Sequence, residues 1–296
     1  MYSPLPADAR LPSSWRTRKS FPLPSFSPRT PAEDLTSFPN PVRSSASPSV
    51  SGAHRTPAPR TSHEGERVLC YNAGMFAHIS HQERYHITLL RHAQSVGNAE
   101  GYWQGQSDFP LTPLGEQQAH ALGRYWQHTG VTFDEIIASP LSRARRTAEI
   151  IGEYLAVPIT FEDVWKERDN GQFAGMRGEE ARRKYPAPEF MPPYEPVGST
   201  GESQWELYLR AGQALHSLMS RPVGEYLVVS HGGILNLTLY AMLGIPVQAN
   251  FQGPRFRFRN TAFASLSYHP ARHQWHLQSL NRHPHWDFER KEPIRP

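Results

Sequence analysis

The sequence predicts a three-layer α/β/α sandwich with a mainly parallel central sheet, preceded by a disordered N-terminal leader. From about Tyr85 onward, short apolar runs typical of strands alternate with longer segments of helical periodicity. Residues 1–60 instead hold 12 of the chain's 28 prolines and many serines, without a sustained apolar period. Such a segment cannot bury a core, so we expect disorder there.

The resulting organisation is a leader over residues 1–74, one domain over residues 85–282 and a C-terminal tail over residues 283–296. Apolar runs predict the strands 86–90, 136–139, 159–161 and 227–230, with 263–268 and 275–279 as a closing pair at one edge of the sheet. Helical patterns predict the helices 115–128, 143–155, 178–185, 202–219 and 234–243.

The first strand, 86–90, is followed by Arg91 and His92 and then by small and polar residues that must form a loop. In an α/β sheet, loops at the carboxyl ends of the strands are where ligands bind. An imidazole is nucleophilic enough at neutral pH to accept a phosphoryl group, and a neighbouring guanidinium can neutralise and orient that group. Taken alone, an Arg-His pair is more often surface charge.

A second histidine, His231, follows the apolar strand 227–230. It is succeeded by Gly232 and Gly233, and a helix is expected to begin near Ile234. The sheet therefore presents two histidines at the ends of strands.

The helix after strand 136–139 begins with three arginines, Arg143, Arg145 and Arg146. Because the helix dipole disfavours cations at this end, at least one of them is expected to meet an anion. The polar loop 165–171 follows the next strand, and a carboxylate in it can act as an acid.

In order, these motifs resemble those of the histidine phosphatase superfamily, the phosphoglycerate-mutase-like proteins, over roughly residues 85–280. The matching segments are Arg91-His92-Ala93, Asn98, 108–118, 139–144, Glu167 and 230–233. Of the three arginines, the resemblance carries over Arg143 alone. Two positions depart from the family pattern, because Ala93 stands where glycine is usual and Gln94 where glutamate is common.

The resemblance implies a role for each matching residue. His92 is the nucleophile that becomes phosphohistidine, and His231 is the second catalytic histidine. Glu167 gives a proton to the leaving alcohol, with Asp169 as the alternative carboxylate. The residues implied to surround the phosphate oxygens are Arg91, Asn98, Arg143, His231 and Gly232. This chemistry needs neither a metal ion nor a cofactor.

Three functions fit this reading: a phosphatase for small phosphate esters, a phosphoglycerate mutase, and a non-catalytic module that binds phosphorylated ligands. Mutases of the family carry a longer insertion after the proton-donor motif, which covers the pocket. Here that interval holds a short helix and the loop 186–201, which is expected to overhang the site as a lid. Water should therefore reach the phosphoenzyme, which favours the phosphatase. The loops expected to contact the leaving group are 102–109, 173–201 and 251–259.

The positive charge of the chain is concentrated in the leader. The formal net charge is +4, yet residues 1–60 carry eight basic and three acidic residues, and the remainder carries 23 basic and 24 acidic residues. The predicted domain is therefore nearly neutral, which argues against a nucleic-acid partner. The expected partner is a small-molecule phosphate ester, and the sequence assigns no oligomeric state.

The single cysteine, Cys70, rules out a disulfide within the chain and is typical of a reducing, cytoplasmic location. No apolar run is long enough to span a bilayer, so no membrane partner is expected. The Arg- and Ser-rich leader leaves open an organelle transit peptide, or a translated region upstream of a start at Met75. Although the chain has 15 histidines, the closest groups lack a cysteine or carboxylate framework, so no metal site is expected.

Overall fold

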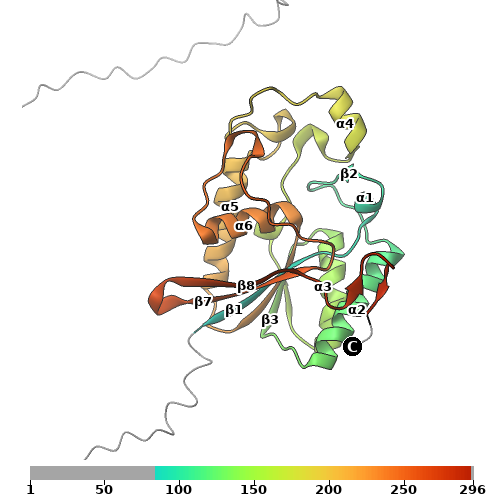
Figure 1. Cartoon of the computed structure of the whole chain (residues 1–296), viewed down its shortest axis with the longest axis vertical. Helices are drawn as coiled ribbons and strands as arrows, with labels where there is room; N and C mark the ends of the chain where they lie inside the picture. The colour runs from blue at the N-terminus through green and yellow to red at the C-terminus, as the bar shows by residue number, and fades with distance from the viewer. Residues whose placement is uncertain (1–83, 295–296) are drawn as a thin grey trace, which may run out of the picture. The chain divides into compact units, whose positions relative to one another are not determined.

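The computed structural model describes residues 84–294, which form the predicted sandwich around one six-stranded sheet (Figure 1). The order of the strands is β4-β3-β6-β1-β7-β8. Their bounds are β1 (Tyr85–Arg91), β3 (Glu135–Ala138), β4 (Ile159–Phe161), β6 (Glu225–Ser230), β7 (Phe263–His269) and β8 (Gln274–Arg282). Strands β1, β3, β4 and β6 are parallel, whereas β7 and β8 run antiparallel at one edge. Each strand predicted from the sequence is present.

Two pairs of helices cover the two faces of the sheet. Helices α2 and α3 pack on one face, and α5 and α6 pack on the other (Figure 1). The bounds of the helices are α1 (Val96–Ala99), α2 (Pro113–Thr129), α3 (Ser142–Leu155), α4 (Gly178–Lys184), α5 (Gln204–Met219) and α6 (Gly232–Leu243). This arrangement confirms the predicted three layers.

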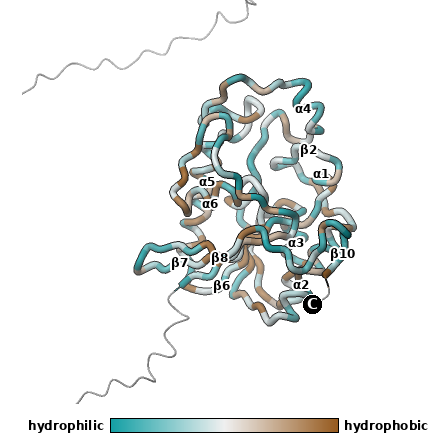
Figure 2. The backbone as a smooth tube through the Cα atoms, viewed as in Figure 1, coloured by the Kyte–Doolittle hydropathy of each residue, from teal (hydrophilic) through white to brown (hydrophobic). Residues whose placement is uncertain are grey.

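Strand β6 shows why a central strand of this sheet can be apolar without interruption. Leu227 and Val229 pack with α2 and α3, whereas Val228 between them packs with α5 and α6. Because both faces are covered, the alternation of apolar and polar residues that marks a half-exposed strand disappears. Figure 2 shows the contrast, with hydrophobic segments in the sheet and a hydrophilic α4 at the periphery.

Side-chain caps determine where two of the helices begin. The hydroxyl of Thr112 accepts a hydrogen bond from the N–H of Gly115 at 3.0 Å, so α2 begins at Pro113, two residues before the predicted start. Ser203 and Glu206 form a capping box, so α5 begins at residue 204 rather than at 202 as predicted. Both caps are local hydrogen bonds that an apolar period does not reveal.

Small elements at the periphery were not predicted. Two antiparallel sheets pair β2 (Tyr102–Trp103) with β5 (Met176–Arg177), and β9 (Trp286–Asp287) with β10 (Glu292–Pro293). Short 3-10 turns occur at η2 (Asp163–Trp165), η3 (Gly171–Phe173), η4 (Val197–Ser199), η5 (Ala249–Phe251) and η6 (Pro270–Arg272). The sheet of β9 and β10 lies in the segment assigned to a tail, and it packs against α2 with Trp286 buried.

The predicted leader, residues 1–74, lies outside the described residues, and so do Cys70 and Met75. Between residues 84 and 294, none of the helices combines the length and the apolarity needed to cross a membrane. The loop 186–201 is irregular except for the turn η4.

His285, which precedes β9, makes the stability of the fold depend on pH. The ring is buried, its Nε2 lies 3.0 Å from the hydroxyl of Thr261, and burial lowers its pKa from 6.5 to about 3. Between these pH values the unfolded chain binds more protons than the folded chain, so the free energy of unfolding falls as the pH falls. We expect His285 to contribute a loss of about 2 kcal/mol between pH 7 and pH 5.

Urea unfolding of the wild type and of His285→Gln at both pH values measures this contribution. The variant should lose correspondingly less stability on acidification. The same pH dependence in both proteins would contradict the assignment.

Candidate active site

The carboxyl ends of β1 and β6 bring the two predicted histidines together. In the parallel register of these strands Arg91 lies opposite Ser230, so His92 and His231 follow at the same edge of the sheet. The centroids of the two rings are 5.0 Å apart, and both residues are buried. Positions 139 residues apart in the chain thus share one site because two strands pair in register.

A backbone hydrogen bond orients the ring of His92. Its Nδ1 lies 2.7 Å from the carbonyl oxygen of Ala93 and donates to it, since a carbonyl can only accept. In the neutral ring the proton therefore resides on Nδ1, and Nε2 carries the free lone pair. Burial, reinforced by the charges of Arg143 and Arg91, lowers the pKa of His92 well below its usual value. The ring is neutral at physiological pH, which is the form that a nucleophile requires.

The departures from the family pattern at positions 93 and 94 are accommodated. Ala93 has a negative φ, so this position does not need glycine, and its N–H donates to the hydroxyl of Thr147 at 3.1 Å. The side-chain oxygen of Gln94 accepts a hydrogen bond from the hydroxyl of Thr112 at 2.9 Å, which ties the loop to the start of α2.

Backbone carbonyl groups anchor the side chains of Arg91 and Arg143. Arg91 donates from Nη1 to the carbonyl of Phe258 at 2.8 Å. Arg143 donates to the carbonyls of Ser107 and Gly105 at 3.0 and 2.7 Å. The Nε of each guanidinium is buried and has no hydrogen-bond partner among the described residues. Burial lowers the pKa of Arg143 to about 10, so it remains charged at neutral pH. These bonds use one N–H group of Arg91 and two of Arg143, so both guanidinium groups keep terminal N–H groups for an anion.

The other two arginines of α3 lie away from this site. The guanidinium of Arg145 stacks over the ring of Phe161 at 3.9 Å, and Arg146 pairs with Glu116 at 3.5 Å. Of the three arginines at the start of this helix, Arg143 is therefore the one expected to meet an anion, and its side chain is buried.

The carboxylate of Glu167 rests on the first turn of α6. It accepts hydrogen bonds from the backbone N–H groups of Gly233 at 3.0 Å, Ile234 at 3.1 Å and Arg168 at 2.9 Å. The N-terminus of a helix favours negative charge, because its first N–H groups have no partner within the helix. A Cβ at position 233 would overlap the carboxylate oxygen, so glycine is required there for this contact.

A cavity of about 340 Å³ joins these groups. Its walls include Arg91, His92, Arg143 and Glu167, which the sequence singled out, together with Gly233. The remaining lining residues are Tyr102, Trp103, Gln104, Gly105, Arg168 and Asn170. Of these, residues 102–105 belong to a loop that was expected to contact the leaving group. Arg168 was not assigned to the site from the sequence, and the signal that could have indicated it was its position next to Glu167.

Three predicted phosphate ligands lie beside the cavity rather than in its lining. His231 is fully buried behind His92, with its Nε2 2.7 Å from the hydroxyl of Ser139. Gly232 begins α6 next to the side chain of Arg91. The side-chain oxygen of Asn98 accepts from Ser95 and Asn260, and this residue lines a neighbouring cavity of about 860 Å³.

No residue of the loop 186–201 lines the cavity, so the structure does not show it as the expected lid. At its end, Gly201 donates its N–H to the carbonyl of Val197 and lies against the loop that contains Gly171. Asp169 belongs to that second loop, where its carboxylate accepts from the N–H of Gly171 at 2.9 Å. Residues 197–201 therefore support the residues that follow Glu167.

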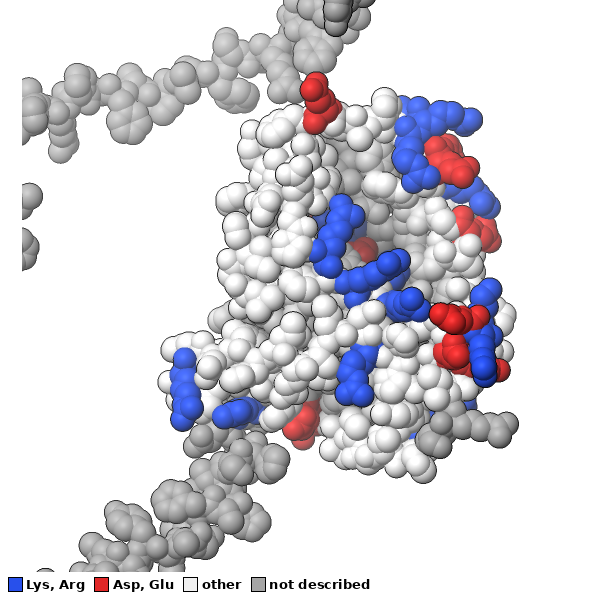
Figure 3. Space-filling view, viewed as in Figure 1, with Lys and Arg blue, Asp and Glu red and all other residues white. Residues whose placement is uncertain are grey.

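Positive charge predominates around the cavity. Figure 3 shows Lys and Arg side chains gathered around a hollow on this face. Three arginines, Arg91, Arg143 and Arg168, line the cavity and are attracted to the single lining carboxylate, Glu167. Within residues 84–294 no three His, Cys, Asp or Glu side chains are grouped as metal ligands would be. The arrangement suits an anion that carries two charges.

Comparison with known proteins identifies the family. Residues 87–283 match the histidine phosphatase superfamily (branch 1), and the chain belongs to this superfamily. It is 31% identical over 199 residues to "Uncharacterized phosphatase PhoE" of Bacillus subtilis, covering 67% of this chain and 95% of that protein. It is 36% identical over 195 residues to "Probable phosphoglycerate mutase GpmB" of Salmonella paratyphi A, covering 64% of this chain and 86% of that protein.

Solved structures agree with this assignment. Bacillus stearothermophilus YhfR superposes with a TM-score of 0.56 at 26% identity, over 66% of this chain and 95% of that one. A mycobacterial glucosyl-3-phosphoglycerate phosphatase in complex with VO3 superposes with a TM-score of 0.57 at 25% identity, over 67% of this chain and 98% of that one. Relatives of this chain are thus named both as phosphatases and as mutases.

The geometry predicts the charge state of His92. Because its pKa is lowered, the ring should stay neutral, with the proton on Nδ1, as the pH falls through 6.5. Long-range ¹H–¹⁵N spectra of the imidazoles, with His92→Gln to assign the signal, measure both the charge and the tautomer. A ring that titrates near 6.5, or one protonated on Nε2, would refute this description.

Proposed function

We propose that the protein is a metal-independent phosphatase that hydrolyses small-molecule phosphate esters through a phosphohistidine intermediate on His92. The observation that carries the proposal is the hydrogen bond from Nδ1 of His92 to the carbonyl of Ala93. It leaves Nε2 unprotonated in a cavity that three arginines and one carboxylate also line. A nucleophile, charge for the phosphate and a group that can transfer a proton therefore face one small space.

In the first step, Nε2 of His92 attacks phosphorus, the N–P bond forms and the bond from phosphorus to the ester oxygen breaks. Arg91 and Arg143 hold the nonbridging oxygens, because both line the cavity, both keep terminal N–H groups and backbone carbonyls fix their positions. Two guanidinium charges balance a phosphate dianion, and both are in place before substrate arrives. His231 supports the ring of His92 from behind, and Gly232 brings the start of α6 beside Arg91.

Glu167 transfers the protons in both steps. Its carboxyl group lines the same cavity as Arg91 and Arg143, so it faces the ester oxygen of a phosphate that these arginines hold. In its protonated form the carboxyl group gives a proton to the leaving alkoxide. The carboxylate that remains then accepts a proton from water as the water attacks phosphohistidine, which releases phosphate and free His92.

We favour hydrolysis over mutase chemistry because the loop 186–201, the expected cover, contributes no residue to the lining of the cavity. In the interval after Glu167 only Arg168 and Asn170 line it, which leaves little to shield a phosphohistidine from water. The mutase name of one group of relatives makes phosphoglycerate isomerisation the alternative to test.

His92→Ala should lower kcat/KM by at least about 10³-fold, because no other group in the cavity can form the covalent intermediate. The matched control is His120→Ala, which removes a histidine of α2 that bonds Tyr154 outside the cavity and should leave turnover unchanged. Assays of p-nitrophenyl phosphate hydrolysis in excess EDTA, with acid-quench detection of phosphohistidine, measure both claims.

Loss of activity in EDTA would contradict metal independence, and isomerisation of 3-phosphoglycerate faster than its hydrolysis would favour the mutase. Absence of any turnover would favour a binding module.

Glu167→Gln should lose about 10² to 10⁴-fold on alkyl phosphates, the range of general acid catalysis, and much less on p-nitrophenyl phosphate. The reason is that an alkoxide needs a proton in order to leave, whereas p-nitrophenolate does not. Asp169→Asn is the control, because its carboxylate only closes a local turn. Equal losses on both substrates would exclude Glu167 as the proton donor, and a selective loss in Asp169→Asn would transfer the role to that residue.

A further inference from the structure

Arg210, on α5, uses every donor of its guanidinium group inside the protein. Its Nε donates to Glu202 at 2.7 Å, and its Nη2 donates to the same carboxylate at 2.6 Å. The other three bonds run to backbone carbonyls, those of Val164 at 3.0 Å, Lys166 at 2.6 Å and Glu167 at 3.2 Å. Five hydrogen bonds from one half-buried side chain are the full capacity of arginine.

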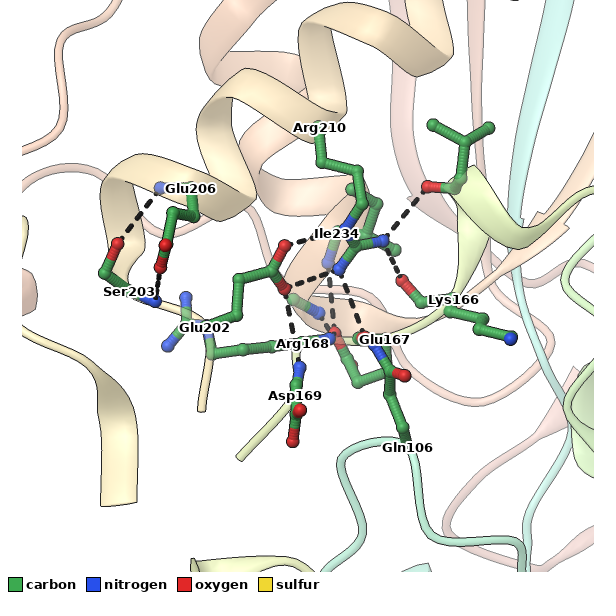
Figure 4. Close-up of polar contacts among 12 residues, drawn as sticks. Gln106, Lys166, Glu167, Arg168, Asp169, Glu202, Ser203, Glu206, Arg210 and Ile234 are labelled. Carbon is green, nitrogen blue, oxygen red and sulfur yellow. Dashed lines mark hydrogen bonds and ion pairs between the residues drawn. The ribbon is translucent and has the colours of Figure 1, made fainter. Parts of the chain in front are cut away.

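The three carbonyls belong to the segment that carries Glu167 into the cavity. Figure 4 shows Arg210 reaching from α5 to the backbone on which Glu167 stands. Gln106 donates to the carbonyl of Glu167 as well, at 3.1 Å. The backbone of Glu167 is thus held from the side of α5, while its carboxylate is held by the first turn of α6.

Glu202 extends the same hold to the residues after Glu167. Its backbone N–H donates to the carbonyl of Asp169 at 2.8 Å, and its carboxylate accepts from the N–H of Asp169 at 3.4 Å. The side chains of Glu202 and Arg210 are only 14% and 17% exposed. One ion pair therefore fixes the chain on both sides of Glu167.

We propose that Arg210, paired with Glu202, is the positioning residue for the proton-donor carboxylate of Glu167. This inference rests on the proposed function of Glu167. Arg210 does not line the cavity, so it touches no substrate and acts only through the 164–169 backbone. Proton transfer demands placement within hydrogen-bond reach, and a small displacement of the donor weakens it while leaving the phosphate pocket intact.

Arg221 supplies a matched control on the same side of the sheet. It follows α5 and pairs with Glu135 at 2.9 Å and Glu162 at 2.6 Å, and its side chain is 18% exposed. Its burial and pairing resemble those of Arg210, but its hydrogen bonds do not reach the backbone of residues 164–169. If both arginines had a purely structural role, replacing either one should therefore have the same effect on the two esters.

The experiment compares Arg210→Met, Arg210→Lys, Glu202→Gln and Arg221→Met on an alkyl phosphate and on p-nitrophenyl phosphate, with melting temperatures recorded. Arg210→Met should lose about 10²-fold in kcat on the alkyl ester, as misplacement of a reacting group does, and only a few-fold on the aryl ester. Lysine has three donors in place of the planar fork of five, so Arg210→Lys should restore part of the loss. KM for either ester should change little.

The double variant Arg210→Met/Glu167→Gln should be no more selective between the two esters than Glu167→Gln alone, because both changes remove the same proton transfer. One result would overturn the positioning role alone. In that result the Arg210 and Glu202 variants lose activity equally on both esters, as Arg221→Met does, while Glu167→Gln still loses more on the alkyl ester. If Glu167→Gln showed no selectivity, the proposed proton donor would fail and this inference with it. Should Arg210→Met fold poorly, Arg210→Lys and Glu202→Gln decide the outcome by the same ratio, the loss of kcat on the alkyl ester divided by the loss on the aryl ester.

Discussion

The site depends on holding like charges together in the absence of a ligand. Arg91 and Arg143 lie within electrostatic reach of each other and of His92, and burial strengthens their mutual repulsion. Carbonyl oxygens of two loops restrain the two guanidinium groups, and the carboxylate of Glu167 offsets part of their charge. Burial, together with the charges of the arginines, keeps the imidazole of His92 neutral. Preorganisation of this kind costs nothing during the reaction, because the fold has already supplied the energy.

The fold and the central part of the site could be predicted because their signals are local in the sequence. Continuous apolar runs marked the strands, and His92 and His231 stood at strand ends. Arg143 could be separated from Arg145 and Arg146 only by resemblance to the family. The features that were not predicted depend on contacts between residues far apart in the chain. Examples are the hydrogen bond from the side chain of Asn260 to that of Asn98 and the hydrogen bond from Arg210 to the carbonyl of Val164. The loop 186–201, expected as a lid, does not line the cavity, because composition indicates a loop without indicating where it packs.

Membership in the histidine phosphatase superfamily narrows the chemistry without choosing between hydrolysis and isomerisation. In this chain the difference rests on what surrounds the cavity. Tyr102 and Trp103 lie on its wall, and they also border the larger neighbouring cavity. Arginine side chains and backbone line one part of the site, whereas the other part opens toward aromatic and charged side chains. Under the proposed function, such a site constrains the phosphate more strongly than the alcohol.

The wide spacing of the site along the chain has a consequence for protein synthesis. Arg91 is anchored to the carbonyl of Phe258, 167 positions later, and its strand pairs with β6 and β7. A ribosome translates His92 long before it translates these partners, and the loops between them must close before the cavity exists. The growing polypeptide therefore carries His92 without the residues that enclose it. The surroundings of His92 are complete only when β7 joins the sheet and residues 258–262 pass over the end of β1.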